Sequence, residues 1–187
     1  MPSFEMSRTS TLATRLGTTV HRSLLLHRLA SLGLGDANAI AAAASSRGLD
    51  YYSAGEESQS FSTAELSKVS HEELVVALVH SSLPWEPQRF RLAAALMASP
   101  GVSANRLANL AIQERVVAVI AEIARSGRHA EPENAFWAEL LSMLPEHAPV
   151  PAGVMPHPSR YMVIPGRTGP RATGPARWVR PRKPSFS

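Results

Sequence analysis

The longest stretch with helical periodicity, Ser103–Arg128, carries its polar residues on two different faces. The polar residues of its first half share one side of a helical wheel: Asn105, Arg106, Asn109 and Gln113. Those of its second half lie roughly 130–150° away on the wheel: Glu114, Arg115, Glu122 and Arg125. Because one straight helix would have to bury opposite sides in its two halves, the pattern predicts a kink or break near Ile112–Glu114. Neither Gly nor Pro marks this point, and the apolar half from Val116 to Ala124 is the predicted core.

Capping residues and prolines predict the other helices. Asp36 is an N-cap for a short Ala-rich helix over 37–47, and Ser70 with Glu73 forms a capping box for a helix over 70–81. Pro87 suits the first turn of a helix over 86–99. We expect Gly127 to end the central helix and Glu131 to begin a last helix over 131–144, with acids in the first turn complementing the helix dipole.

Composition supports an all-α fold. Hydrophobic residues make up 44% of the chain but aromatics only 6%, so Leu, Val, Ile and Ala must build the core. The expected architecture is a small bundle of four to six short helices with a flexible N-terminal segment and a disordered basic Pro/Gly-rich C-terminal tail. Its predicted parts are an Arg/Ser/Ala-rich, helical or partly disordered N-terminal segment and linker over 1–60, a helical domain over 61–147 and an extended, basic Pro/Gly/Arg-rich tail over 148–187.

The N-terminal segment has two possible interpretations. Arg8, Arg15 and Arg22 recur every seven residues and would share one face of a helix. Residues 1–35 are rich in Arg and Ser and poor in acids, which is also the composition of an organellar targeting segment. We expect an ordinary surface helix or a poorly ordered start in a cytoplasmic protein, with organelle targeting by residues 1–35 as the alternative.

The C-terminal tail carries the basic character of the chain. Residues 150–187 contain seven basic and no acidic residues, and nine of the fifteen prolines lie from Pro149 onward. The candidate partner-binding or phosphate-binding residues of this tail are Arg167, Arg171, Arg177, Trp178, Arg180, Arg182 and Lys183. Tyr161 and the three residues after it are expected to form a short strand or to lie along the helical domain.

No pattern in the sequence points to catalysis, a metal or a cofactor. The chain has no cysteine, which excludes thiolate zinc sites and cysteine nucleophiles. No two of the seven histidines have the i, i+4 spacing of a helical metal site, so we expect solvated or capping histidines. The paired acids Glu72–Glu73 and Glu131/Glu133 are explained by helix starts, where glutamates are normally exposed.

These observations predict a non-enzymatic helical module that binds another protein. The alternative is a nucleic-acid-associated protein that binds phosphates through its basic tail. No run of apolar residues is long enough for a membrane-spanning helix, so no membrane span is expected. The sequence predicts neither the partner nor the oligomeric state.

Overall fold

The computed structural model describes residues 10–47 and 67–161. All regular elements in these ranges are helices, which confirms the predicted helical fold class for this part of the chain. Their bounds are α1 Leu12–Leu16, α2 Leu24–Ser31, α3 Ala37–Ser45, α5 His71–Leu78, α6 Pro87–Met97, α7 Ala104–Gln113, α8 Val117–Ala130, α9 Ala135–Met143 and α10 Pro158–Tyr161. None of these helices is long and apolar enough to cross a membrane.

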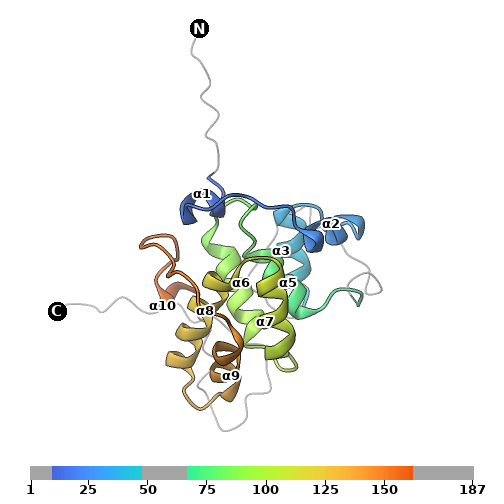
Figure 1. The fold of residues 1–187 in the computed structure, drawn as a ribbon. Coiled ribbons are helices and arrows are strands. Elements are labelled where there is room, and N and C mark those ends of the chain that lie inside the picture. The colour runs from blue at the N-terminus through green and yellow to red at the C-terminus, as the bar shows by residue number, and fades with distance from the viewer. Residues whose placement is uncertain (1–9, 48–66, 162–187) are drawn as a thin grey trace, which may run out of the picture.

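Helices α5 and α6 occupy the centre of the fold. In Figure 1 they lie between α1 and α2 at the top and α9 at the bottom. Nearly every side chain of α5 is buried, because α3, α6 and α7 all contact this helix. The core also takes in side chains from the N-terminal helices, among them Leu12, Leu29 and Ile40. The bundle expected from the sequence did not include α1, α2 or α10.

Local capping residues start the central helices as predicted. The Asp36 carboxylate accepts hydrogen bonds from the N–H groups of Asn38 and Ala39 at the start of α3. Ser70 and Glu73 form the capping box of α5, and Pro87 begins α6. Ser62 and Glu65 have the same capping-box spacing in the sequence, but they lie outside the described residues. These helix starts depend on side chains within three residues of the cap, which is why the sequence alone reveals them.

The predicted break in the central stretch is confirmed. Helix α7 ends at Gln113 and α8 begins at Val117. The Val116 N–H donates to the Ala111 carbonyl at 2.9 Å and the Arg115 N–H donates to the Ile112 carbonyl at 3.2 Å. This is a Schellman motif, whose left-handed position is usually glycine but here is Arg115, with φ 56°.

Two predicted boundaries after the break are wrong. Gly127 does not end α8, which continues to Ala130 because Trp137 packs directly on the glycine. Glu131 does not begin a helix; α9 begins at Ala135 after the N-cap Asn134. Glu131 instead accepts a hydrogen bond from the Trp137 indole N–H at 2.8 Å. Both errors arise from one side chain, Trp137, which fills the space between α8 and α9.

The first-turn acids of α5 are buried, contrary to expectation. Glu72 accepts the Ser103 backbone N–H at 2.9 Å, so it caps the start of α7 from a distant part of the chain. Glu73 bonds the Ser70 N–H and pairs with the Arg28 guanidinium of α2. Each carboxylate therefore has donors that compensate for its burial.

Residues 10–35 and 148–161 both contribute side chains to the folded core. Residues 10–35 do not form one helix with Arg15 and Arg22 on a common face; they form α1, a connecting segment and α2. Arg8 lies outside the described residues. Residues 148–161 pack on the helices instead of extending freely, with Val154 and Tyr161 buried. The Tyr161 hydroxyl bonds the Ser126 hydroxyl at 2.7 Å, so this residue lies along the helical domain, in a short helix and not a strand.

Candidate metal centre

The connection between α5 and α6 holds the N-terminal segment against the bundle. Here the chain runs antiparallel to the start of α1: the Leu12 N–H donates to the Leu83 carbonyl at 3.0 Å, and the Ala13 N–H donates to the Ser81 carbonyl at 2.8 Å. We call residues 10–31, which include α1 and α2, the N-terminal arm. These backbone bonds fix the arm where it passes the end of α5.

Three side chains from distant segments meet beside this connection. His21 comes from the arm, His80 follows α5, and Glu114 follows α7. We call these residues the His–His–Glu cluster. The Glu114 Oε2 atom lies 3.6 Å from His80 Nε2 and 3.9 Å from His21 Nε2. One ligand atom from each residue lies within 4.8 Å of the other two.

The atoms that face one another in the cluster are buried and lack hydrogen bonds. His21 Nε2, His80 Nε2 and Glu114 Oε2 have no hydrogen-bond partner among the described residues. His80 is 0% exposed and Glu114 is 6% exposed. A buried polar atom without a partner costs roughly 1–3 kcal/mol, and three such atoms within 4.8 Å of one another could be satisfied by one shared partner.

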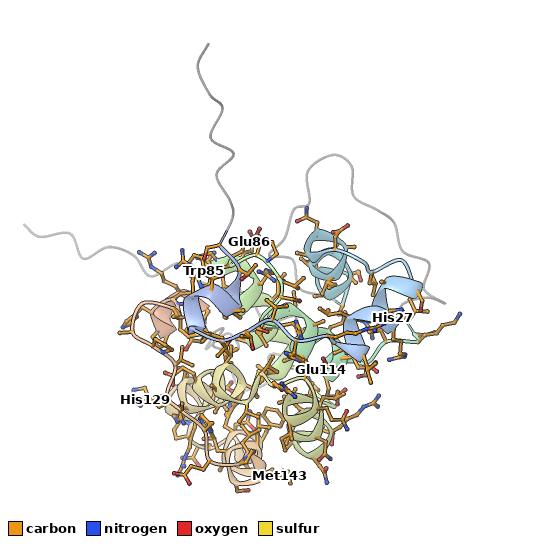
Figure 2. The ribbon with its side chains drawn as sticks, turned by 45° about the horizontal axis from the view of Figure 1, so that its top comes forward. His27, Trp85, Glu86, Glu114, His129 and Met143 are labelled. Atoms are coloured by element: carbon orange, nitrogen blue, oxygen red, sulfur yellow. The ribbon has the colours of Figure 1, made fainter. Side chains whose placement is uncertain are left out.

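The outer atoms of the cluster are held in place by the protein. Glu114 Oε1 accepts the backbone N–H of Leu25 at 3.1 Å, which ties the end of α7 to the start of α2. Figure 2 shows Glu114 where the connection between α1 and α2 passes over the helices. The His80 Nδ1 atom lies 2.8 Å from the Ser82 hydroxyl. The second atom of Glu114 and of His80 is therefore positioned while the first faces the centre.

The protonation state of His80 suits a ligand. Burial, with a smaller effect from His21, lowers the pKa of His80 to about 4, although the Glu114 carboxylate opposes this shift. His80 is therefore neutral at pH 7. In one tautomer Nδ1 accepts the Ser82 backbone N–H at 3.2 Å; in the other, Nδ1–H donates to the Ser82 hydroxyl and leaves the Nε2 lone pair free. Only the second tautomer binds a metal through Nε2.

Two imidazoles and a carboxylate are a donor set for divalent first-row transition ions, zinc among them. With zinc-to-ligand distances of 2.0–2.2 Å, neighbouring ligand atoms in a tetrahedral site lie about 3.3–3.5 Å apart. The two separations to Glu114 exceed this range by only a few tenths of an ångström, and all three ligand atoms lie within 4.8 Å of one another, so side-chain rotations would have to bring them closer together. The cluster therefore fits an ion with three protein ligands and a further position for water or another ligand.

The sequence did not predict this site. Its candidate residues Arg167, Arg171, Arg177, Trp178, Arg180, Arg182 and Lys183 lie outside the described residues. The expectation of solvated or capping histidines is wrong for His80, because the arm covers it. The one sequence feature that pointed toward the cluster was Glu114. This carboxylate lies at the predicted break, where the helix changes direction, and the structure buries its side chain.

No family model, curated protein or solved structure matches this chain.

Proposed function

We propose that the His–His–Glu cluster binds one divalent transition-metal ion, and that this ion fixes the N-terminal arm of a non-enzymatic helical module that binds another protein. The observation that carries the proposal is the convergence of three buried, unpartnered ligand atoms from three segments. The ion would satisfy all three atoms at once and would join the arm, the end of α5 and the end of α7.

The metal is tested by titrating the full chain with zinc chloride in a calorimeter, and with cobalt(II) followed by its visible absorption. One ion per chain is expected, with tetrahedral cobalt bands. His21→Ala and Glu114→Gln should each weaken binding by about a hundredfold or more. An absence of zinc binding, or equal affinity in these variants, would show that the cluster holds only water or a proton.

Two exposed residues provide matched controls. His27 lies on the same helix as Leu25 but is exposed, and Figure 2 shows it at the outer edge of α2, away from Glu114. His27→Ala and Glu139→Gln, the latter on the exposed side of α9, should leave zinc affinity unchanged. These controls separate the cluster from the adventitious binding of zinc to surface histidines and carboxylates.

The protein-binding part of the proposal is supported by exposed apolar side chains beside the cluster. Val20 is 56% exposed, Leu24 79% and Ile112 44%. Val20 precedes His21, and the bond from the Leu25 N–H to Glu114 brings Leu24 near the end of α7, where Ile112 lies. We call Val20, Leu24 and Ile112 the apolar patch; an exposed apolar surface formed by these three side chains would be typical of an interaction site.

The patch is tested by a pull-down in which the intact chain, the Leu24→Asp variant and the tail-deleted chain are compared. A partner that recognises the patch should be lost with Leu24→Asp and retained without residues 166–187. Met143→Asp is the matched control, since Met143 is also an exposed hydrophobic residue but lies on α9, at the bottom of the view in Figure 2. Equal capture by all variants would contradict a role for the patch.

A second candidate function is phosphate binding by the basic tail, favoured by the absence of acids among residues 150–187. If it holds, nucleic-acid affinity should fall steeply with salt concentration and disappear when residues 166–187 are removed. An intact chain without salt-dependent affinity for single-stranded or double-stranded nucleic acid would end this alternative.

A further inference from the structure

The connection between α1 and α2 is attached to the rest of the fold mainly through one side chain. We call residues 17–23 the strap. Residues 19–22 neither donate nor accept a hydrogen bond with any described residue. Thr19, Val20 and Arg22 are exposed, whereas the His21 side chain is only 16% exposed. The polar and ring contacts of these four residues with the described part of the chain are those of His21 with Glu114 and His80.

The two ends of the strap are fixed independently of His21. At the first end the Thr18 N–H donates to the Ala13 carbonyl at 3.0 Å, and α1 has the backbone bonds described above to the connection after α5. Beyond the second end, the Arg28 guanidinium of α2 donates to the Lys68 carbonyl at 2.7 Å. A short segment that is held at both ends and lacks bonds between them can open without unfolding the helices that flank it.

Gly17 provides a hinge at the first residue of the strap. Its φ of 68° lies in the left-handed region, which glycine adopts without strain at the end of a helix. A Cβ atom at this position would meet nothing within 4 Å, so the backbone conformation and not the available space favours glycine here. Hinges of moving loops are often small residues at the end of a helix or strand, as Gly17 is.

The strap forms one wall of a pocket of about 390 Å³. Thr18, Thr19 and His21 line this pocket from the strap, while Val79 lines it from the end of α5 and Val119 from α8. Both valines are only 1% exposed. Figure 2 shows the connection between α1 and α2 passing over the helices. Movement of the strap away from the helices would therefore open the pocket and expose the two valines to solvent.

We propose that the strap is a lid over this pocket and that ligation of a metal ion by His21 holds the lid closed. The inference rests on the proposed metal site, because the ion is what joins His21 to His80 and Glu114. Without the ion, His21 Nε2 faces two buried atoms with which it forms no hydrogen bond, so its hold on the strap is weak. The ion thereby controls access to the pocket.

The strength of this control follows from the reciprocity of linked equilibria. Opening the strap removes His21 from the ion, and the loss of this ligand should weaken zinc binding by about a hundredfold. Zinc must then disfavour the open strap by the same factor, about a hundredfold. The lid therefore has a predicted response to zinc that can be measured separately from zinc binding itself.

Trypsin measures the open strap because it cleaves after Arg22, an exposed residue next to His21. A protease needs its substrate extended over several residues, so cleavage at this bond follows the population of the open strap. Saturating zinc should slow cleavage of the full chain after Arg22 by about a hundredfold relative to the chain in EDTA. Mass spectrometry identifies the cleaved bond, and a short arginine peptide shows whether zinc inhibits trypsin itself.

His21→Ala and His27→Ala are a matched pair of variants for this assay. In His21→Ala, zinc should no longer slow cleavage after Arg22, whereas His27→Ala should behave as the parent chain does. Calorimetry of the same samples separates the lid from the metal site on which it rests. An absence of zinc binding overturns both proposals. Binding of one zinc ion per chain with an unchanged rate of cleavage overturns the lid alone.

A nitroxide in solution tests whether the pocket opens with the strap. The nitroxide TEMPOL broadens the NMR signals of methyl groups that it reaches. In EDTA the methyl signals of Val79 and Val119 should broaden more than those of Val76, a fully buried valine of α5 that does not line the pocket. Zinc should remove this difference. Equal broadening of the three valines with and without zinc would overturn the lid, because the strap would then not uncover the pocket.

Discussion

The junctions at the two ends of α8 behave in opposite ways. Between α7 and α8 the helix breaks at Arg115, although no Gly or Pro is present. Near the other end the helix runs straight through Gly127, where a break is usual. The first junction is polar, with unpartnered buried atoms in the adjoining cluster; the second is apolar, and its carboxylate, Glu131, is bonded.

This difference shows that packing, more than local residue preference, decides where these helices end. At Gly127 a Cβ atom would lie 2.5 Å from the Trp137 indole ring, so the glycine serves close approach of α9 and not chain reversal. At Arg115 the chain must turn because the two helices bury different faces. Glycine is therefore required where the helix continues and is absent where the helix ends.

The largest expected effect comes from Gly127→Ala. Alanine favours a helix by about 1 kcal/mol over glycine, yet the clash with Trp137 should destabilise the fold by about 2–3 kcal/mol. Urea denaturation measures this change in the free energy of unfolding. In a Trp137→Leu background, Gly127→Ala should lower the free energy of unfolding much less, because the indole ring with which alanine clashes is gone. If Gly127→Ala instead stabilised the fold, the close packing of Trp137 on Gly127 would not explain why α8 continues through the glycine.

Glu72→Gln tests whether the start of α7 also depends on a distant residue. Burial raises the pKa of Glu72. Hydrogen bonds from the backbone N–H groups of Ser103 and Glu72 and from the Ser70 hydroxyl lower it, as does the charge of Arg106. Together these effects outweigh burial and leave the pKa of Glu72 below its ordinary value. A carboxyl with a lowered pKa stabilises the fold above its ordinary pKa, and this contribution disappears as pH falls through the lowered value.

The Glu72→Gln variant should therefore be less stable than the parent by about 1 kcal/mol at pH 7. The difference should shrink as the pH is lowered below about 4, because the parent carboxylate then becomes protonated as well. Chemical denaturation at a series of pH values measures it, with Glu139→Gln as the exposed control. A constant difference across this range would mean that the charge of Glu72 does not matter.

The smallest expected effect, and the only stabilising one, comes from Arg115→Gly. Relief of the left-handed strain should outweigh the extra freedom of glycine in the unfolded chain and stabilise the fold by about 0.5–1 kcal/mol. Arg115→Ala keeps a Cβ atom in the same backbone conformation and should bring no such gain. If glycine instead destabilises the fold, the Arg115 side chain contributes more to stability than its left-handed backbone costs.

The sequence by itself determined the helical class, several helix starts and the break after α7. Asp36, Ser70, Pro87 and Ser103 act on backbone groups within a turn of their own positions, so these starts follow from neighbouring residues. The break followed from periodicity, because a helix in a small domain buries one face and the polar residues of 103–128 require two.

Only the tertiary structure decided the burial of Glu72 and Glu73, the passage of α8 through Gly127 and the candidate metal centre. His21, His80 and Glu114 are far apart along the chain, and no spacing rule relates them. They meet because backbone bonds fix the N-terminal arm beside α5 and the Schellman motif directs Glu114 inward. Such contacts depend on how whole helices pack, and short-range sequence patterns carry no information about that arrangement.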